Sequence, residues 1–125
     1  MEAQKDFYQV VEQIFGRDPR YKPDCYEFVM QALEHTQKKL KIEGHVSGRQ
    51  LLDGIRDFAL KEYGPMAKTV LKHWGVSNTA DFGNIVFNMI EQQLLSKTDQ
   101  DRLADFENVF DFEEAFKHIV KDLSL

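Results

Sequence analysis

The chain has 125 residues, a net charge of −5 and a sequence pI of about 5.3. A chain of this length can bury one continuous core without a metal or a disulfide, so we expect one globular domain over residues 1–125. The acidic balance argues against a protein whose overall field attracts nucleic-acid phosphates. The single cysteine, Cys25, excludes an intramolecular disulfide, and no apolar run approaches the roughly 20 residues of a membrane span. We therefore expect a cytoplasmic protein.

The first third of the chain is predicted to form two helices. Apolar residues recur at helical spacing over residues 3–15. Residues 17–23 are expected to form a loop, because Pro19 and Pro23 each push the preceding residue out of the α region. Pro23 also suits the first turn of a second helix, which extends to about Leu40.

The middle of the chain has the signals of a short strand followed by three helices. The strand is expected at residues 45–46. Ser47 opens the third helix, and Gln50 three residues later matches a capping box. A fourth helix is predicted over residues 65–74. Thr79 is expected to cap a fifth helix that extends to about residue 93.

After the fifth helix, the apolar pattern is compatible with two structures. Phe106, Phe110 and Phe112 alternate with acidic residues, which is typical of a strand with one aromatic face. Leu103, Phe106 and Phe110 also match helical spacing. We favour the strand, as the second arm of a β-hairpin that begins near Leu94.

A last helix is expected to open at Asp111. The predicted fold is therefore mainly α (α+β), a single domain of about six helices with a small β-hairpin. Residues 45–111 would have winged-helix-like order, with the first two helices and the last one added around them.

DNA binding is one alternative function, because the fourth and fifth helices have the spacing of a helix-turn-helix. Asn84 and Asn88 could read base edges, and Lys97 and Arg102 could hold phosphates. However, residues 79–93 contain no Lys or Arg. We therefore treat nucleic acid as an unlikely partner that the sequence does not exclude.

The leading prediction is a non-catalytic protein–protein interaction domain. Phe106, Phe110 and Phe112, with Glu107 and Asp111 beside them, resemble the aromatic anchors and charged rim of an interface. The plainer arrangement is that the phenylalanines complete the core while the acids remain in water. The sequence leaves both arrangements open.

A further alternative is an enzyme or a protein that binds a small anionic ligand. A helix start with a glycine and an arginine, as at Ser47, Gly48 and Arg49, can hold an anion. The spacing matches no nucleotide-binding fingerprint, and the four histidines do not have the spacing of a zinc hydrolase. We therefore expect no catalytic residue, no metal and no cofactor.

Several segments together resemble a small bacterial protein family of about this length and of uncharacterised function. The resemblance covers nearly the whole chain. It implies a bacterial cytosolic protein and a self-contained domain, but no activity and no functional residue. The segments are Arg17–Tyr21 (RDPRY), His45–Gly48 (HVSG), Leu51–Arg56 (LLDGIR), Thr79–Phe87 (TADFGNIVF) and Phe110–Phe116 (FDFEEAF).

Overall fold

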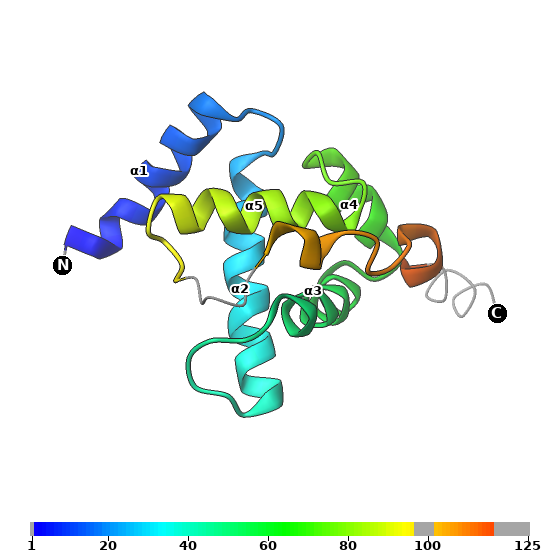
Figure 1. Cartoon of the computed structure of the whole chain (residues 1–125). Coiled ribbons are helices and arrows are strands. Elements are labelled where there is room, and N and C mark those ends of the chain that lie inside the picture. Colours follow the sequence, from blue (N-terminus) through cyan, green and yellow to red (C-terminus); the bar gives the residue numbers. More distant parts are fainter. Residues whose placement is uncertain (1, 97–101, 117–125) are drawn as a thin grey trace.

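The computed structural model describes residues 2–96 and 102–116 (Figure 1), and in these residues the fold is all-α. None of the helices in these two ranges is long and apolar enough to cross a membrane. Residues 112–116 are also helical. The helices are α1 (Glu2–Arg17), α2 (Pro23–Leu40), α3 (Gly48–Tyr63), α4 (Ala67–His73) and α5 (Thr79–Glu91), with 3₁₀ turns η1 (Gly64–Met66) and η2 (Leu103–Phe106).

Side-chain caps start α3 and α5. At α3 the predicted capping box is confirmed: the Gln50 amide donates to Ser47 Oγ over 3.0 Å, and the Ser47 amide donates to Gln50 Oε1 over 2.9 Å. At α5 the predicted cap was one residue late. Asn78, not Thr79, accepts a hydrogen bond from the Asp81 amide over 3.0 Å. Thr79 is instead buried.

Helix α4 ends where the sequence predicts, at Trp74 and Gly75. Gly75 has φ +100, and the Val76 amide donates to the Leu71 carbonyl over 2.9 Å, as in a Schellman cap. A Cβ on Gly75 would lie 2.1 Å from the carbonyl oxygen of Arg20. Only glycine fits here, and this close approach fixes the loop between α1 and α2 against the end of α4.

The predicted β-hairpin is wrong, and so is the winged-helix order of residues 45–111. No strand occurs in the part of the chain that the structure describes. Helix α5 ends in a left-handed residue, Gln93 (φ 65), and the Leu94 amide donates to the Met89 carbonyl over 2.8 Å. This Schellman cap turns the chain at the point where the hairpin was expected to begin. The short strand predicted at residues 45–46 is also absent.

The aromatic alternation that suggested a strand comes from two separate turns. Phe106 ends η2 and is 3% exposed, whereas Phe112 starts the next helical segment and is 6% exposed. Asn108 lies between them with φ 53, in the left-handed region. Each aromatic therefore reaches the core from its own turn, without the strand pairing that an extended segment would need.

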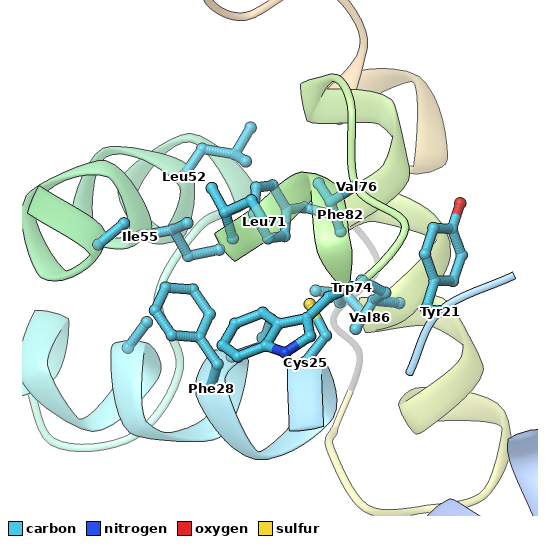
Figure 2. Packing of buried hydrophobic residues seen from close by; sticks show 14 of the residues in the cluster. Tyr21, Cys25, Phe28, Leu52, Ile55, Leu71, Trp74, Val76, Phe82 and Val86 are labelled. Carbon is cyan, nitrogen blue, oxygen red and sulfur yellow. The ribbon is translucent and has the colours of Figure 1, made fainter. Parts of the chain in front are cut away.

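The core lies between α2, α3, α4 and α5 (Figure 2). Phe28 from α2 and Trp74 have ring centroids 5.5 Å apart, and Tyr63 meets Trp74 edge-on at 5.9 Å. Burying one such side chain contributes about 1.5–3 kcal/mol. These rings therefore join α2 to the ends of α3 and α4.

Helices α2 and α3 approach each other closely at Gly54. A Cβ on Gly54 would lie 1.7 Å from Thr36 Oγ1. The Thr36 side chain cannot easily move away, because it is buried and its hydroxyl donates to the Ala32 carbonyl over 2.7 Å. The backbone of α3 therefore rests directly on the side chain of Thr36.

Replacing Gly54 with alanine should lower the free energy of unfolding by about 1–3 kcal/mol, because the added methyl overpacks the contact with Thr36. The matched control is Gly16→Ala in α1. A Cβ there meets nothing within 4 Å, so this change should raise stability by about 0.5–1 kcal/mol. Urea unfolding measures both. Equal effects of the two variants would show that the α2–α3 crossing is looser than described.

Candidate functional site

Helix α5 runs across the middle of the molecule, with η2 alongside it (Figure 1). Glu91, its last residue, is the only residue of α5 that is exposed. Phe87 is half-buried and its ring meets Phe106 edge-on at 6.3 Å. A helix covered in this way has no free face to lay into a DNA groove.

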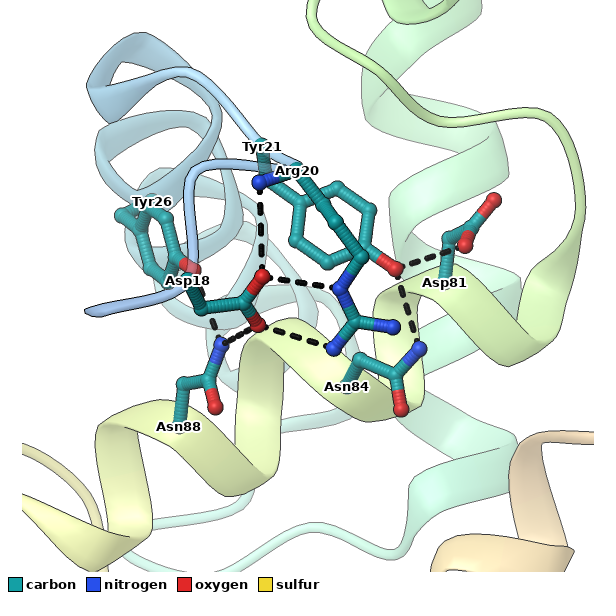
Figure 3. Close-up of polar contacts among 7 residues, drawn as sticks. All are labelled: Asp18, Arg20, Tyr21, Tyr26, Asp81, Asn84 and Asn88. Carbon is teal, nitrogen blue, oxygen red and sulfur yellow. Dashed lines mark hydrogen bonds and ion pairs between the residues drawn. The ribbon is translucent and has the colours of Figure 1, made fainter. Parts of the chain in front are cut away.

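The first half of α5 is tied to the loop between α1 and α2 by hydrogen bonds (Figure 3). The Tyr21 hydroxyl donates to Asp81 Oδ1 over 2.6 Å, and it accepts from Asn84 Nδ2 over 2.9 Å. Asp81 Oδ2 in turn accepts from the Ser77 amide over 2.8 Å. One carboxylate therefore caps α5 and also holds the loop.

The second half of α5 is held to the same loop through Asn88. Its Nδ2 donates to Asp18 Oδ2 over 2.9 Å and to the Tyr26 hydroxyl over 3.0 Å. Asp18 also accepts two hydrogen bonds from the Arg20 guanidinium, each 2.8 Å long. The Arg20 guanidinium lies over the Tyr21 ring, 5.1 Å from its centroid. Asn88 therefore joins the loop, α2 and α5.

The pKa shifts in this network, called here the clamp, are those of groups that hold the loop to α5. Burial, aided by the hydrogen bond to the Asp81 carboxylate, raises the pKa of Tyr21 to about 12. Hydrogen bonds from the Arg20 guanidinium and the Asn88 amide hold the pKa of Asp18 below its usual range, against the opposite effect of partial burial. At neutral pH the tyrosine stays protonated and the aspartate ionised, so neither group is poised for acid–base catalysis.

The structure places the residues proposed to bind DNA in different settings. The amides of Asn84 and Asn88 already bond within the protein. Arg102 is exposed at the start of η2. Lys97 lies outside the described residues. No observation on the described residues therefore favours DNA reading by this helix.

The acidic–aromatic segment is divided between core and surface. Phe106 and Phe112 are core residues, so they do not form the exposed anchors expected of an interface. Phe110 is half-buried and stacks on Phe112, with the ring centroids 6.0 Å apart. Glu107 and Asp111 are exposed. Only Phe110 and the two acids keep the properties of the predicted interface.

These remaining residues line a cleft at the start of α5, called here the α5 cleft. Its volume is about 630 Å³. The Thr79 hydroxyl accepts a hydrogen bond from the Val109 amide over 3.1 Å, which joins its two walls. One wall is formed by Lys68 and residues 77–80, and the other by Glu107, Asn108 and residues 110–113.

The predicted anion site at the start of α3 is largely occupied by the protein itself. Ser47 Oγ already accepts the Gln50 amide in the capping box. A Cβ on Gly48 would lie 3.0 Å from the Phe106 ring, so that side of the glycine is covered. Arg49 is exposed. The structure therefore leaves little room for an anion against Gly48.

Cys25 is fully buried, and its burial raises the pKa of the thiol well above the usual range. It therefore lacks the exposed thiolate of a reactive cysteine. Within residues 2–96 and 102–116, no cluster of His, Cys, Asp and Glu side chains could hold a metal ion.

Sequence reasoning missed the clamp of Tyr21, Asp18 and Asp81. One signal could have indicated it: Asn84 and Asn88 are four residues apart on a mainly apolar helix, so one stripe of α5 had to meet polar partners. Lys68 and Asn78 of the α5 cleft were also missed, because nothing local relates them to residues 107–113.

No protein-family model, curated protein or solved structure matches this chain. The resemblance to a small bacterial family therefore stays a prediction. The function has to be inferred from the geometry of the chain itself.

Replacing Asp18 with asparagine should lower the free energy of unfolding at neutral pH by about 1 kcal/mol, since the Arg20 side chain is 59% exposed and solvent weakens the pair. The pKa of Asp18 is lower in the folded state. Its contribution is therefore complete above the unfolded pKa of about 3.9 and is lost as the pH falls through the folded pKa.

Urea unfolding at several pH values tests this prediction. The difference between wild type and Asp18→Asn should narrow as the pH drops below about 4. The same substitution at Asp53, which is exposed on α3, should change stability little at any pH. A difference for Asp18→Asn that does not depend on pH would mean that its charge does not hold the loop.

Proposed function

We propose that the chain is a non-catalytic binding domain whose α5 cleft receives a basic, partly apolar segment of a partner protein. The observation that carries the proposal is the placement of Phe110. Its half-buried ring lies in a cleft whose other side chains include Glu107, Asp111 and Glu113. An aromatic anchor with charged groups around it is typical of protein interfaces, where the anchor lies at the centre and the charges form the rim.

The charge of the cleft favours a cationic partner. Among the described residues that line the cleft, Lys68 is the only basic one, and its ammonium group is paired with the Glu113 carboxylate. Glu107 and Asp111 then leave a net negative charge. Complementary charge speeds association and selects against acidic partners. A lysine or arginine next to an apolar residue would meet both the acids and the ring.

The cleft is held in shape before any partner binds. Asn78 and Asp81 cap α5 on one side. On the other side, Asp111 Oδ2 accepts the Glu114 amide over 3.1 Å and caps the next helical segment. The bond between Thr79 and Val109 joins the two sides. A preformed site loses little conformational entropy on binding, which favours affinity.

The size of the cleft indicates an anchor point within a larger contact. A volume of about 630 Å³ accommodates a few side chains, whereas a stable protein interface covers about 800 Å² on each partner. We therefore expect the partner to extend over the exposed residues on both sides of the cleft.

The test is affinity purification of the tagged chain from a native cell lysate, with and without nuclease. The same experiment is repeated with Glu107→Lys and with Phe110→Ser. We expect a protein that survives nuclease treatment and is lost with both variants. With the purified partner, Glu107→Lys should weaken binding roughly tenfold, or about 1.4 kcal/mol. Reversing the matching basic residue of the partner should restore it.

The matched control is Glu12→Lys, the same charge reversal at an exposed position of α1. It should retain the partner, and all variants should be checked for cooperative unfolding. Equal capture by wild type and both cleft variants would refute the cleft as the binding site. Loss of all captured protein after nuclease treatment would instead show that nucleic acid is the partner.

A further inference from the structure

A second cavity lies near the other end of α5, and none of its described lining residues lines the α5 cleft. It is called here the apolar pocket, and its volume is about 310 Å³. Side chains from four separate helical elements line it, so it is not a feature of one surface helix. The main apolar side chains are Leu33 of α2, Leu51 of α3, Val86 and Ile90 of α5, Leu94 after α5, and Phe106 of η2.

The walls of the pocket are fixed by local bonds. Lys41 ends α2 in the left-handed region with φ 56, and the Ile42 amide donates to the Gln37 carbonyl over 3.0 Å. The Gln37 side chain also donates to the Gly44 carbonyl, which holds the connector to α2. Ser47 then starts α3 in its capping box. The connector therefore forms a stable wall of the pocket.

The back wall depends on Phe106. The Phe106 ring covers Gly48 on one side. On the other side, a Cβ added to Gly83 would lie 2.8 Å from the Cβ of Phe106. The ring is 3% exposed and cannot move without opening the contact between α3, α5 and η2. The pocket is therefore a preformed cavity, as small-molecule sites usually are.

The volume sets the size of the occupant. An engineered apolar cavity of about 150 Å³ admits a molecule of the size of benzene. The apolar pocket is about twice as large, and it lies at the lower end of the range of about 300–1,000 Å³ found for ligand sites. Two fused aromatic rings match this volume, whereas a peptide segment does not.

The chemistry of the lining sets the polarity of the occupant. Among the described residues that line the pocket, none is Asp, Glu, Lys or Arg. A charged group taken from water into such a site would lack a counter-charge, which is strongly unfavourable. The polar lining side chains are those of Gln37, His45, Ser47 and Ser96. The side chains of Gln37 and Ser47 already bond within the protein, so a ligand with at most one polar group matches this lining.

We infer that the apolar pocket binds one small, uncharged, mainly apolar molecule of about the size of two fused rings. This inference does not depend on the proposed protein partner, because no described residue lines both the pocket and the α5 cleft. Either site can fail its test while the other passes.

The test uses 1-naphthol as the probe, with 1-naphthoate as its charged counterpart. Titration of the ¹³C-methyl-labelled protein with 1-naphthol should shift the methyl signals of Val86 and Ile90 in a saturable way. The methyl signal of Leu60 on α3, which does not line the pocket, should stay unchanged. 1-Naphthol should also raise the melting temperature, because a ligand that binds the folded state stabilises it.

A filling variant and its matched control locate the binding. Leu94→Trp places an indole in the pocket and should abolish the 1-naphthol shifts. Leu40→Trp makes the same substitution at a 43% exposed residue outside the pocket and should bind as wild type does. If Leu94→Trp does not fold, the methyl map of the wild-type protein still decides the location.

Absence of saturable shifts at Val86 and Ile90 would overturn the inference. So would shifts that persist in a folded Leu94→Trp variant, because the ligand would then lie elsewhere. 1-Naphthoate should bind at least roughly tenfold more weakly than 1-naphthol, since no Lys or Arg is present among the described lining residues to pair with its carboxylate. Equal binding of the two probes would refute the uncharged ligand class.

Discussion

The contact of Phe106 with Gly48 and Gly83 is the constraint on which the two candidate sites depend. Two glycines on different helices leave room for the Phe106 side chain, which lies so close that a Cβ would be 3.0 Å from its ring at Gly48 and 2.8 Å from its Cβ at Gly83. Dense packing of this kind joins the start of α3, the middle of α5 and η2 into one unit. The ring is a wall of the apolar pocket, and the residue after it, Glu107, lines the α5 cleft.

Helix α5 is the central helix of the fold, because other parts of the chain cover it on nearly every side. Apolar residues meet α3 and η2, and a polar stripe meets the loop between α1 and α2 (Figure 3). This polar stripe lowers the stability little, because the partly buried side-chain amides of Asn84 and Asn88 each donate hydrogen bonds within the protein. A helix that is covered in this way has no open face that could bind a partner along its length. The two cavities lie near its two ends.

The interpretation of the acidic–aromatic segment changes with the structure. In the sequence it is one run of alternating phenylalanines and acids, which suggests that all its phenylalanines have the same function. In the fold Phe106 and Phe112 complete the core, and Phe110 is left half-buried among carboxylates. The hydrophobic effect places most of these rings inside. What remains for binding is a smaller surface than the sequence suggested, but one whose shape is fixed by hydrogen bonds on both sides.

The sequence by itself determined the helices of the first 91 residues, because each carries an apolar stripe, and the helices after α1 also carry a proline or a capping box near their start. It also indicated the stop at Gly75 and the start at Asp111. Only the tertiary structure decided the segment after α5, where Phe106 and Phe112 satisfy a two-residue alternation without a strand. It also decided the clamp between Tyr21 and Asp81, sixty residues apart, and both cavities. Local patterns report which face of an element is apolar. They do not show which segments, far apart in the sequence, will pack so closely that one of them must have a glycine at the contact. Those close contacts shape the two sites.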